Sequence, residues 1–200
     1  MSQRHIDPAS IVHPNAKIGA GCYVWAWSQI REGATIGRCT SIGQGAYVGP
    51  GVVVGGSCKI QNYALIYEPA VLEDSVFVGP GAVLTNDRYP RAVNLDGSEK
   101  SAGDWNPVGV YIEHGASIGA KAVLVGPVRI GTWSMVGAGS VVSADVKPFS
   151  LVVGIPAAHV GWVGRSGHRL VKANDEWVCP DSGERFKELD GHLSLIGHTA

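Results

Sequence analysis

The stretch IREGATIGRCTSIGQGAYV, residues 30–48, decides the fold, because an aliphatic side chain returns at every sixth position within it. The same spacing continues on both sides of this stretch without a miss. Most of these aliphatics are followed four positions later by a small residue, such as Ala34, Thr40 or Ala46. The full series is Ile6, Val12, Ile18, Val24, Ile30, Ile36, Ile42, Val48, Val54, Ile60, Ile66, Leu72, Val78 and Leu84.

A period of six is a multiple of the strand period of two but not of the helical period of 3.6. A helix would therefore scatter these aliphatics over all of its faces. Short strands that alternate with tight turns, with one large inward residue per hexad, are typical of a parallel β-helix. Three hexads make one triangular coil, and successive coils stack about 4.8 Å apart. We expect an all-β protein.

The repeat breaks after Leu84 and resumes at Ile112. The inserted segment is TNDRYPRAVNLDGSEKSAGDWNPVG, residues 85–109, and long polar loops of this kind are usually functional. Counting the hexads gives about six to seven coils. We expect residues 1–158 to form the β-helix domain and residues 159–200 to form a small C-terminal appendage with a short β-hairpin. The second series of aliphatics is Ile112, Ile118, Leu124, Ile130, Val136 and Val142.

Charge and hydropathy exclude several classes of function. The chain has 16 basic and 17 acidic residues and a net charge of −1, which gives no general attraction to nucleic acid or to anionic membranes. The N-terminus lacks an apolar signal segment, and no apolar run is long enough to span a bilayer. We expect a soluble cytoplasmic protein without nucleic-acid partners or membrane insertion.

The four cysteines do not form a disulfide or metal pattern. Cys22 and Cys58 share the small inward position two coils apart, about 9.6 Å by stacking, which exceeds the reach of a disulfide. Cys39 falls at a corner. Cys179 begins half of a zinc knuckle whose second cysteine is replaced by Ser182, so we expect no bound metal.

The hexads over about residues 6–158 resemble those of the left-handed β-helix hexapeptide acyltransferases. The run KIQNYALIYEPAVLEDSVFVGPGAVLTNDRYPRA at 59–92 and the ending VVGIPAAHVGW at 152–162 are similar to the nucleotide-sugar N-acetyltransferases. The tail WVCPDSGERF at 177–186 adds likeness to the enzymes that act on UDP-2-acetamido-3-amino-2,3-dideoxyglucuronate in surface polysaccharide and O-antigen synthesis.

This resemblance implies an activity, an assembly and a site. Such enzymes acetylate the 3-amino group of a nucleotide-linked sugar with acetyl-CoA, and they are homotrimers with active sites between neighbouring prisms. The Asn of the TN motif, which contacts the acceptor amine in that group, matches Asn86. Substrate contacts are expected from Tyr67, Glu68, Asp87, Arg88 and Arg91, and acetyl-CoA contacts from Gly137, Ala138, Gly154 and Pro156.

Some alternatives stay open at this point. Relatives acting on other acceptors use a loop histidine as base, but the segment 85–109 contains none, and His114 is expected at an exposed corner outside the chemistry. A different acceptor, through O-acetylation or a dTDP-3-amino-6-deoxyhexose, is the main alternative. A γ-type carbonic anhydrase needs several histidines around zinc, and a non-catalytic β-helix would show a regular outward face.

Overall fold

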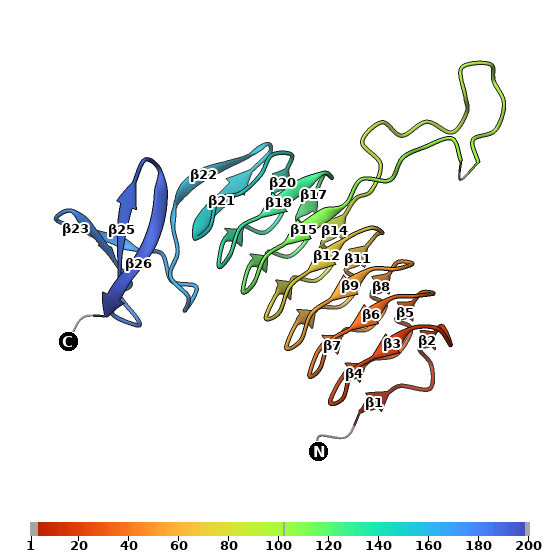
Figure 1. The fold of residues 1–200 in the computed structure, drawn as a ribbon, viewed down its shortest axis with the longest axis horizontal. Coiled ribbons are helices and arrows are strands. Elements are labelled where there is room, and N and C mark those ends of the chain that lie inside the picture. The colour runs from red at the N-terminus through yellow and green to blue at the C-terminus, as the bar shows by residue number, and fades with distance from the viewer. Residues whose placement is uncertain (1–3, 102, 199–200) are drawn as a thin grey trace.

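The computed structural model describes residues 4–101 and 103–198, and these form a three-sided parallel β-helix followed by a separate antiparallel sheet (Figure 1). The described residues contain no helix, as expected for an all-β chain. The architecture is the parallel β-helix that the hexads predict, and it agrees with the left-handed form that the resemblance implies. No segment of the described residues is a helix long and apolar enough to cross a membrane.

Each side of the prism is one sheet, and along most of it each strand pairs in parallel with the strand three places later in the chain; the last two strands of sheet 1 depart from this spacing, and the final one runs antiparallel. Sheet 1 contains β1 (His5–Ile6), β4 (Tyr23–Val24), β7 (Ser41–Ile42), β10 (Lys59–Ile60), β13 (Phe77–Val78), β16 (Ser117–Ile118), β19 (Met135–Val136), β21 (Ser150–Gly154) and β22 (Ala157–Trp162). Sheet 2 contains β2 (Ile11–Val12), β5 (Gln29–Ile30), β8 (Tyr47–Val48), β11 (Leu65–Ile66), β14 (Val83–Leu84), β17 (Val123–Leu124) and β20 (Val141–Val142). Sheet 3 contains β3 (Lys17–Ile18), β6 (Thr35–Ile36), β9 (Val53–Val54), β12 (Val71–Leu72), β15 (Val110–Ile112) and β18 (Val128–Ile130).

The hexad aliphatics fill the prism as predicted. Those from Val24 to Val142 are almost completely buried, whereas Ile6, Val12 and Ile18 are only partly buried, because no further coil packs beneath the first one. The turns also stack closely. A Cβ on Gly37 would lie 2.4 Å from the backbone of Gly55 in the next coil, which explains why glycine follows the aliphatic at such corners.

Three corners connect the sheets, and we name them by the sheets they join. Corner 1–2 contains the turns 61–64, 79–82, 119–122 and 137–140; corner 2–3 contains 49–52, 67–70 and 125–127; corner 3–1 contains 55–58, 73–76, 113–116 and 131–134. The segment 85–109 leaves the prism at corner 2–3, after β14, and returns to sheet 3 as β15. Figure 1 shows this segment projecting away from the prism as a long arm.

The C-terminal end is larger than the hexad count predicts. The prism continues past Val142, because Val146 forms a bridge with Ile130 and β21 adds an eighth parallel strand to sheet 1. Beyond it lies a four-stranded antiparallel sheet rather than a short hairpin, made of β23 (Val171–Ala173), β24 (Glu176–Val178), β25 (Glu184–Leu189) and β26 (His192–His198). This sheet has its own apolar cluster around Phe186 and Trp162. The proposed division at residue 158 falls inside β22 and stays a prediction.

Candidate functional site

The acceptor residues expected from the sequence gather at corner 2–3, where the inserted segment begins. Strand register aligns Leu65 with Val83 and Ile66 with Leu84, so Tyr67 and Glu68 lie one coil below Thr85 and Asn86. The backbone of Asn86 is fixed by a 2.9 Å hydrogen bond that its carbonyl accepts from the Val108 N–H. This bond joins the two limbs of the segment at its base.

The side chain of Asn86 is half-buried, and its carboxamide forms no hydrogen bond with any residue that the structure describes. The side chain of Thr85, by contrast, is bonded within the protein: its hydroxyl accepts a 3.2 Å hydrogen bond from the N–H of Gly126 in the coil above. Thr85 therefore holds the segment to the prism, whereas the Asn86 carboxamide stays available to a ligand.

The inserted segment encloses a hollow of about 390 Å³ between its two limbs. Asp87 and Arg88 line it together with Lys100, Asp104 and Trp105 from the returning limb. Asp87 also accepts a 2.8 Å hydrogen bond from the Tyr89 N–H, which shapes the turn. Arg88 and Lys100 place one cation on each limb, where they can pair with a diphosphate or a carboxylate, and Asp87 and Asp104 balance their charge in the free protein.

Arg91 is the one residue of the expected acceptor set that does not lie in this group. Its side chain is exposed, donates to the carbonyl of Pro90 at 2.8 Å and does not line the hollow. The expectation that it touches substrate stays a prediction.

The expected acetyl-CoA residues gather at a different corner. Gly137 and Ala138 lie in corner 1–2, where a Cβ on Gly137 would lie 2.6 Å from Val153 of β21. The Gly154 N–H donates to the Ser140 hydroxyl at 3.1 Å, so the β21–β22 hairpin, with Pro156 at its tip, sits directly on this corner. All four residues are therefore close together in space.

A groove of about 710 Å³ runs along corner 1–2 beside these residues. Of the residues expected to contact acetyl-CoA, only Ala138 lines this groove. The others could have been found from the 18-residue coil, because Asn62, Pro80, Ala120 and Ala138 each stand two positions after an aliphatic of sheet 1. The lining residues are Asn62, Tyr63, Pro80, Gly81, Ala120, Lys121, Ala138 and Gly139.

His114 lies in the turn between β15 and β16, at corner 3–1, whereas the two groups above lie at corners 2–3 and 1–2. It is half-buried rather than exposed, because its ring packs edge-on against Trp133 with centroids 5.2 Å apart. The Glu73 carboxylate accepts from the His114 backbone N–H at 2.8 Å and from the Tyr111 hydroxyl at 2.6 Å. The expected corner position is correct, and the expected exposure is not.

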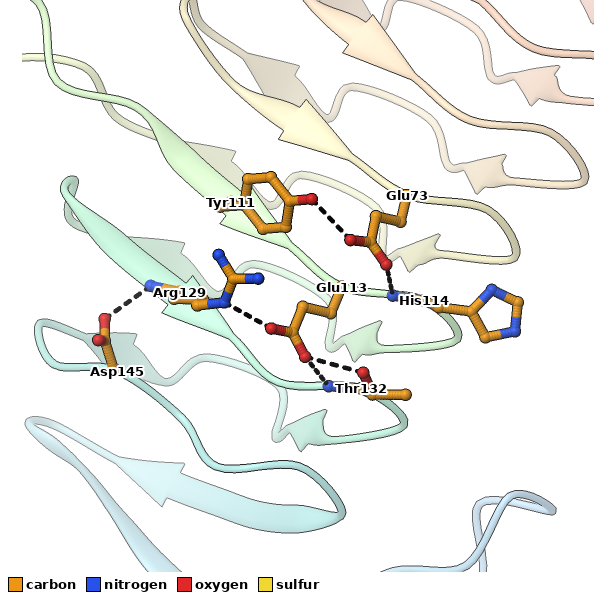
Figure 2. A network of polar contacts seen from close by, with 7 residues as sticks. All are labelled: Glu73, Tyr111, Glu113, His114, Arg129, Thr132 and Asp145. Carbon is orange, nitrogen blue, oxygen red and sulfur yellow. Dashed lines mark hydrogen bonds and ion pairs between the residues drawn. The ribbon is translucent and has the colours of Figure 1, made fainter.

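Two charged groups near His114, Glu113 and Arg129, pair with each other (Figure 2). Glu113 accepts hydrogen bonds from the backbone and hydroxyl of Thr132, both at 2.8 Å, and forms an ion pair with Arg129. Burial opposes ionisation of Glu113, but these hydrogen bonds outweigh it and lower its pKa. The guanidinium of Arg129 also lies 4.3 Å from the centre of the Tyr111 ring. This network joins three coils and is structural.

The four cysteines lie outside the acceptor and acetyl-CoA groups described above. Cys22 and Cys58 are buried free thiols, and Cys39 is an exposed one, as the hexad positions predict. Cys179 is buried and lies 3.2 Å from the Ser166 hydroxyl and 3.4 Å from the Ser182 N–H. Within residues 4–101 and 103–198, no three His, Cys, Asp or Glu side chains are placed to hold a metal ion.

Comparison with known proteins identifies the repeat. Residues 15–50 match the family described as bacterial transferase hexapeptide (six repeats). The serine acetyltransferase of Escherichia coli strain K12 is 34% identical over 125 residues, which are 62% of this chain and 38% of the relative. The dTDP-3-amino-3,6-dideoxy-alpha-D-galactopyranose 3-N-acetyltransferase of Aneurinibacillus thermoaerophilus is 40% identical over 85 residues, which are 42% of this chain and 44% of the relative.

The chain spans less than half of the length of these curated relatives. Among solved structures, a putative acetyltransferase of Bacillus cereus superposes with a TM-score of 0.54 at 20% identity, covering 78% of this chain and 81% of that one. At that identity the likeness establishes the fold. Residues 15–50 therefore carry the repeat that this family model describes, and the solved structure establishes the β-helix fold.

Proposed function

We propose that the protein is an acetyl-CoA-dependent N-acetyltransferase that acts on the 3-amino group of a nucleotide-linked amino sugar. The observation that carries this proposal is the free carboxamide of Asn86 at the base of the inserted segment, beside Tyr67 and Glu68. The relative from Aneurinibacillus thermoaerophilus, whose name specifies a 3-amino sugar nucleotide, supports the same class of acceptor.

The chemistry needs an unprotonated amine held against the thioester carbon. A sugar amine flanked by electron-withdrawing oxygens should have a pKa nearer the ~8 of an α-amino group than the ~10.4 of lysine, so part of it is free base at neutral pH. The Asn86 carboxamide can accept a hydrogen bond from that amine and orient its lone pair. Arg88 and Lys100 suit the diphosphate of the nucleotide in the adjacent hollow.

The acyl donor is proposed to lie along corner 1–2. Ala138 lines the groove there, and the Gly154–Ser140 hydrogen bond holds the β21–β22 hairpin, with Pro156 at its tip, on the same corner. An extended pantetheine arm fits a groove that follows stacked turns, and the apolar side chains of Pro80 and Ala120 would contact its methylene groups.

The two groups of residues lie on different corners of one prism, with sheet 2 between them, and this supports the proposed homotrimer. The outward side chains of sheet 2 include Leu65, Val83, Val123 and Val141, which are apolar and half-buried. A cyclic arrangement that places corner 2–3 of one copy on corner 1–2 of the next would cover this apolar row and complete the site. The projecting segment 85–109 would then reach the neighbouring copy (Figure 1).

The preferred acceptor is UDP-2-acetamido-3-amino-2,3-dideoxyglucuronate, with a role in surface polysaccharide or O-antigen synthesis. The motif residues of 59–92 support this choice, and Arg88 and Lys100 in the hollow can pair with an anionic diphosphate or uronate carboxylate. We place the reaction in the cytoplasm, since acetyl-CoA and nucleotide sugars are supplied there.

The test is release of free CoA thiol by the full chain with acetyl-CoA and a panel of acceptors: UDP- and dTDP-linked 3-amino sugars, with and without a uronate, and serine. We expect turnover with 3-amino sugar nucleotides and the highest kcat/KM for the UDP-linked uronate. Turnover with serine alone, or with none of the nucleotide sugars, would refute the proposed function.

A further inference from the structure

Corner 2–3 contains a carboxylate oxygen that nothing in the described chain satisfies. Oε2 of Glu68 is buried and has no hydrogen-bond partner among residues 4–101 and 103–198, although the residue as a whole is only half-buried. Buried polar atoms almost always have a partner, and an unsatisfied one is costly. Because Oε2 is buried against Gly49 of the coil below, a ligand at the base of the inserted segment would meet this carboxylate through its other oxygen, Oε1, and no donor in the described chain weakens the basicity of the group.

The register of the coils explains why the donor is missing. At equivalent corner positions, Asn62 Oδ1 accepts from the Gln44 N–H at 3.1 Å, and Asp74 Oδ1 accepts from the Gly56 N–H at 2.6 Å. In both cases the donor stands 18 residues earlier in the chain. The residue 18 positions before Glu68 is Pro50, which has no N–H.

Glycine leaves room for the Glu68 carboxylate in this position. A Cβ on Gly49 would lie 2.4 Å from Glu68 Oε2, so a larger residue in the coil below would displace the carboxylate. In the coil above, Asn86 occupies the position two residues after Leu84, which is in register with Ile66. Neighbouring strands are about 4.8 Å apart, so Glu68 and Asn86 flank the same point at the base of the inserted segment.

The surroundings of Glu68 are aromatic and charged. The rings of Tyr47 and Tyr67 lie 5.2 Å apart beside it. The pKa of Tyr47 is raised, first by burial and next by the negative charge of Glu68, whereas Arg31 acts in the opposite direction. The charged or titratable groups around this carboxylate include Tyr47, Tyr67 and Arg31, and Arg31 is paired with Glu32 at 3.0 Å.

We propose that Glu68 is the general base of the acetyl transfer, receiving a proton from the acceptor amine while Asn86 orients it. This inference rests on the proposed function. As the amine nitrogen bonds to the thioester carbon, one N–H proton moves to a Glu68 oxygen. The C–S bond then breaks, and the proton passes to the departing thiolate, which leaves an amide and a free CoA thiol with Glu68 ionised again.

This role explains why Pro50 and Gly49 stand beneath Glu68. A backbone N–H at residue 50 would donate to the Glu68 carboxylate, just as the Gly56 N–H donates to Asp74. A carboxylate that already accepts such a hydrogen bond is a weaker base. The proline keeps the oxygen free, and the glycine keeps space for it.

The experiment measures kcat and KM for thiol release by the full chain with acetyl-CoA and the best 3-amino sugar nucleotide. Glu68→Gln keeps the shape of the side chain and removes its basicity, so we expect kcat to fall by about 10²-fold or more with KM within about threefold. Pro50→Ala restores the backbone donor without touching Glu68, and we expect kcat to fall about tenfold. Asp74→Asn, at the equivalent position of corner 3–1, is the matched control and should keep kcat within about twofold.

Circular dichroism and melting curves establish that each variant is folded. If wild-type protein turns over and Glu68→Gln keeps kcat within about threefold, Glu68 is not the base, while the proposed function stands. A loss confined to KM would assign Glu68 to binding instead and would equally overturn the proposal. If wild-type protein acetylates no amino sugar, the proposed function fails and the role of Glu68 fails with it.

Discussion

Replacement of Asn86 by alanine should damage catalysis without damaging the fold. The backbone of Asn86 stays fixed through the 2.9 Å bond from Val108 to its carbonyl, which the substitution leaves intact. Its carboxamide makes no bond to the rest of the described chain, so no internal partner is lost. We therefore expect the melting temperature to stay within about 2 °C, because exposed or half-buried changes of this kind cost little.

The expected kinetic loss follows from a single positioning hydrogen bond in a partly enclosed site. Such a group is worth about 10²-fold in kcat/KM, or roughly 2.7 kcal/mol. Asn94→Ala is the matched control, since Asn94 lies in the same segment but is already bonded to the Ser98 hydroxyl at 3.1 Å. We expect that variant to keep kcat/KM within about twofold.

His114→Ala should have a much smaller kinetic effect than Asn86→Ala. Its imidazole packs on Trp133 at corner 3–1, away from the inserted segment, so kcat should change less than about fivefold. The assay is initial-rate thiol release with acetyl-CoA and a nucleotide 3-amino sugar. If His114→Ala is nearly inactive and Asn86→Ala is nearly normal, a dedicated histidine base exists and the reasoning from the inserted segment is wrong.

Further predictions concern assembly, stability, thiols and metal. Light scattering of the wild-type protein should give about 63 kDa, three times the 20.9 kDa chain. Val123→Glu places a charge on the outer face of sheet 2 and should give the monomer. A monomeric wild type at micromolar concentration would disprove the trimer. Glu113→Gln should lower the free energy of unfolding by about 1–3 kcal/mol at pH 7 and by little at pH 3. The pKa of Glu113 is lower in the folded protein than in the unfolded chain, so its ionised carboxylate stabilises the fold at neutral pH, and this stabilisation is lost as the pH falls through the folded-state pKa. Equal losses at both pH values in denaturant titrations would contradict this. A thiol reagent should modify Cys39 rapidly and buried Cys22 and Cys58, whose pKa values burial raises, only on unfolding; peptide mapping that finds Cys22 labelled first would contradict the packing. Protein purified without chelator should contain no stoichiometric zinc, and zinc that is lost on Cys179→Ser would show the opposite.

The prism could be predicted from the sequence because one aliphatic per hexad is an unambiguous signal, and the buried series from Val24 to Val142 matches it. The C-terminal end of the prism was harder to predict from the sequence. The chain between Val142 and Ser150 departs from the hexad spacing, so the bridge at Val146 and the strand β21 do not show in the period. The four-stranded C-terminal sheet also lacks a repeat, and its short strands are held by the cluster around Phe186 rather than by local pattern.

The candidate site was partly predictable. The 18-residue coil places Glu68 under Asn86, and the structure has that register. Pro50, 18 positions before Glu68, shows in the sequence that the backbone donor is missing there, but the burial of Glu68 Oε2 against Gly49 is seen only in the structure. The corner that each residue occupies follows from counting strands, but the separation of the two groups across sheet 2 became clear only in three dimensions.

The most direct test is complementation between two inactive variants. Asn86→Ala removes the acceptor side of the proposed site, and Ala138→Trp fills the groove of the acyl donor at corner 1–2. If each site takes Asn86 from one copy and Ala138 from the next, trimers reassembled from an equal mixture should regain about a quarter of wild-type thiol release, because that share of the interfaces carries both intact halves. If each site lies within a single chain, or if no trimer forms, the mixture will stay as inactive as its parents, and the account of a shared acetyl-transfer site will be wrong.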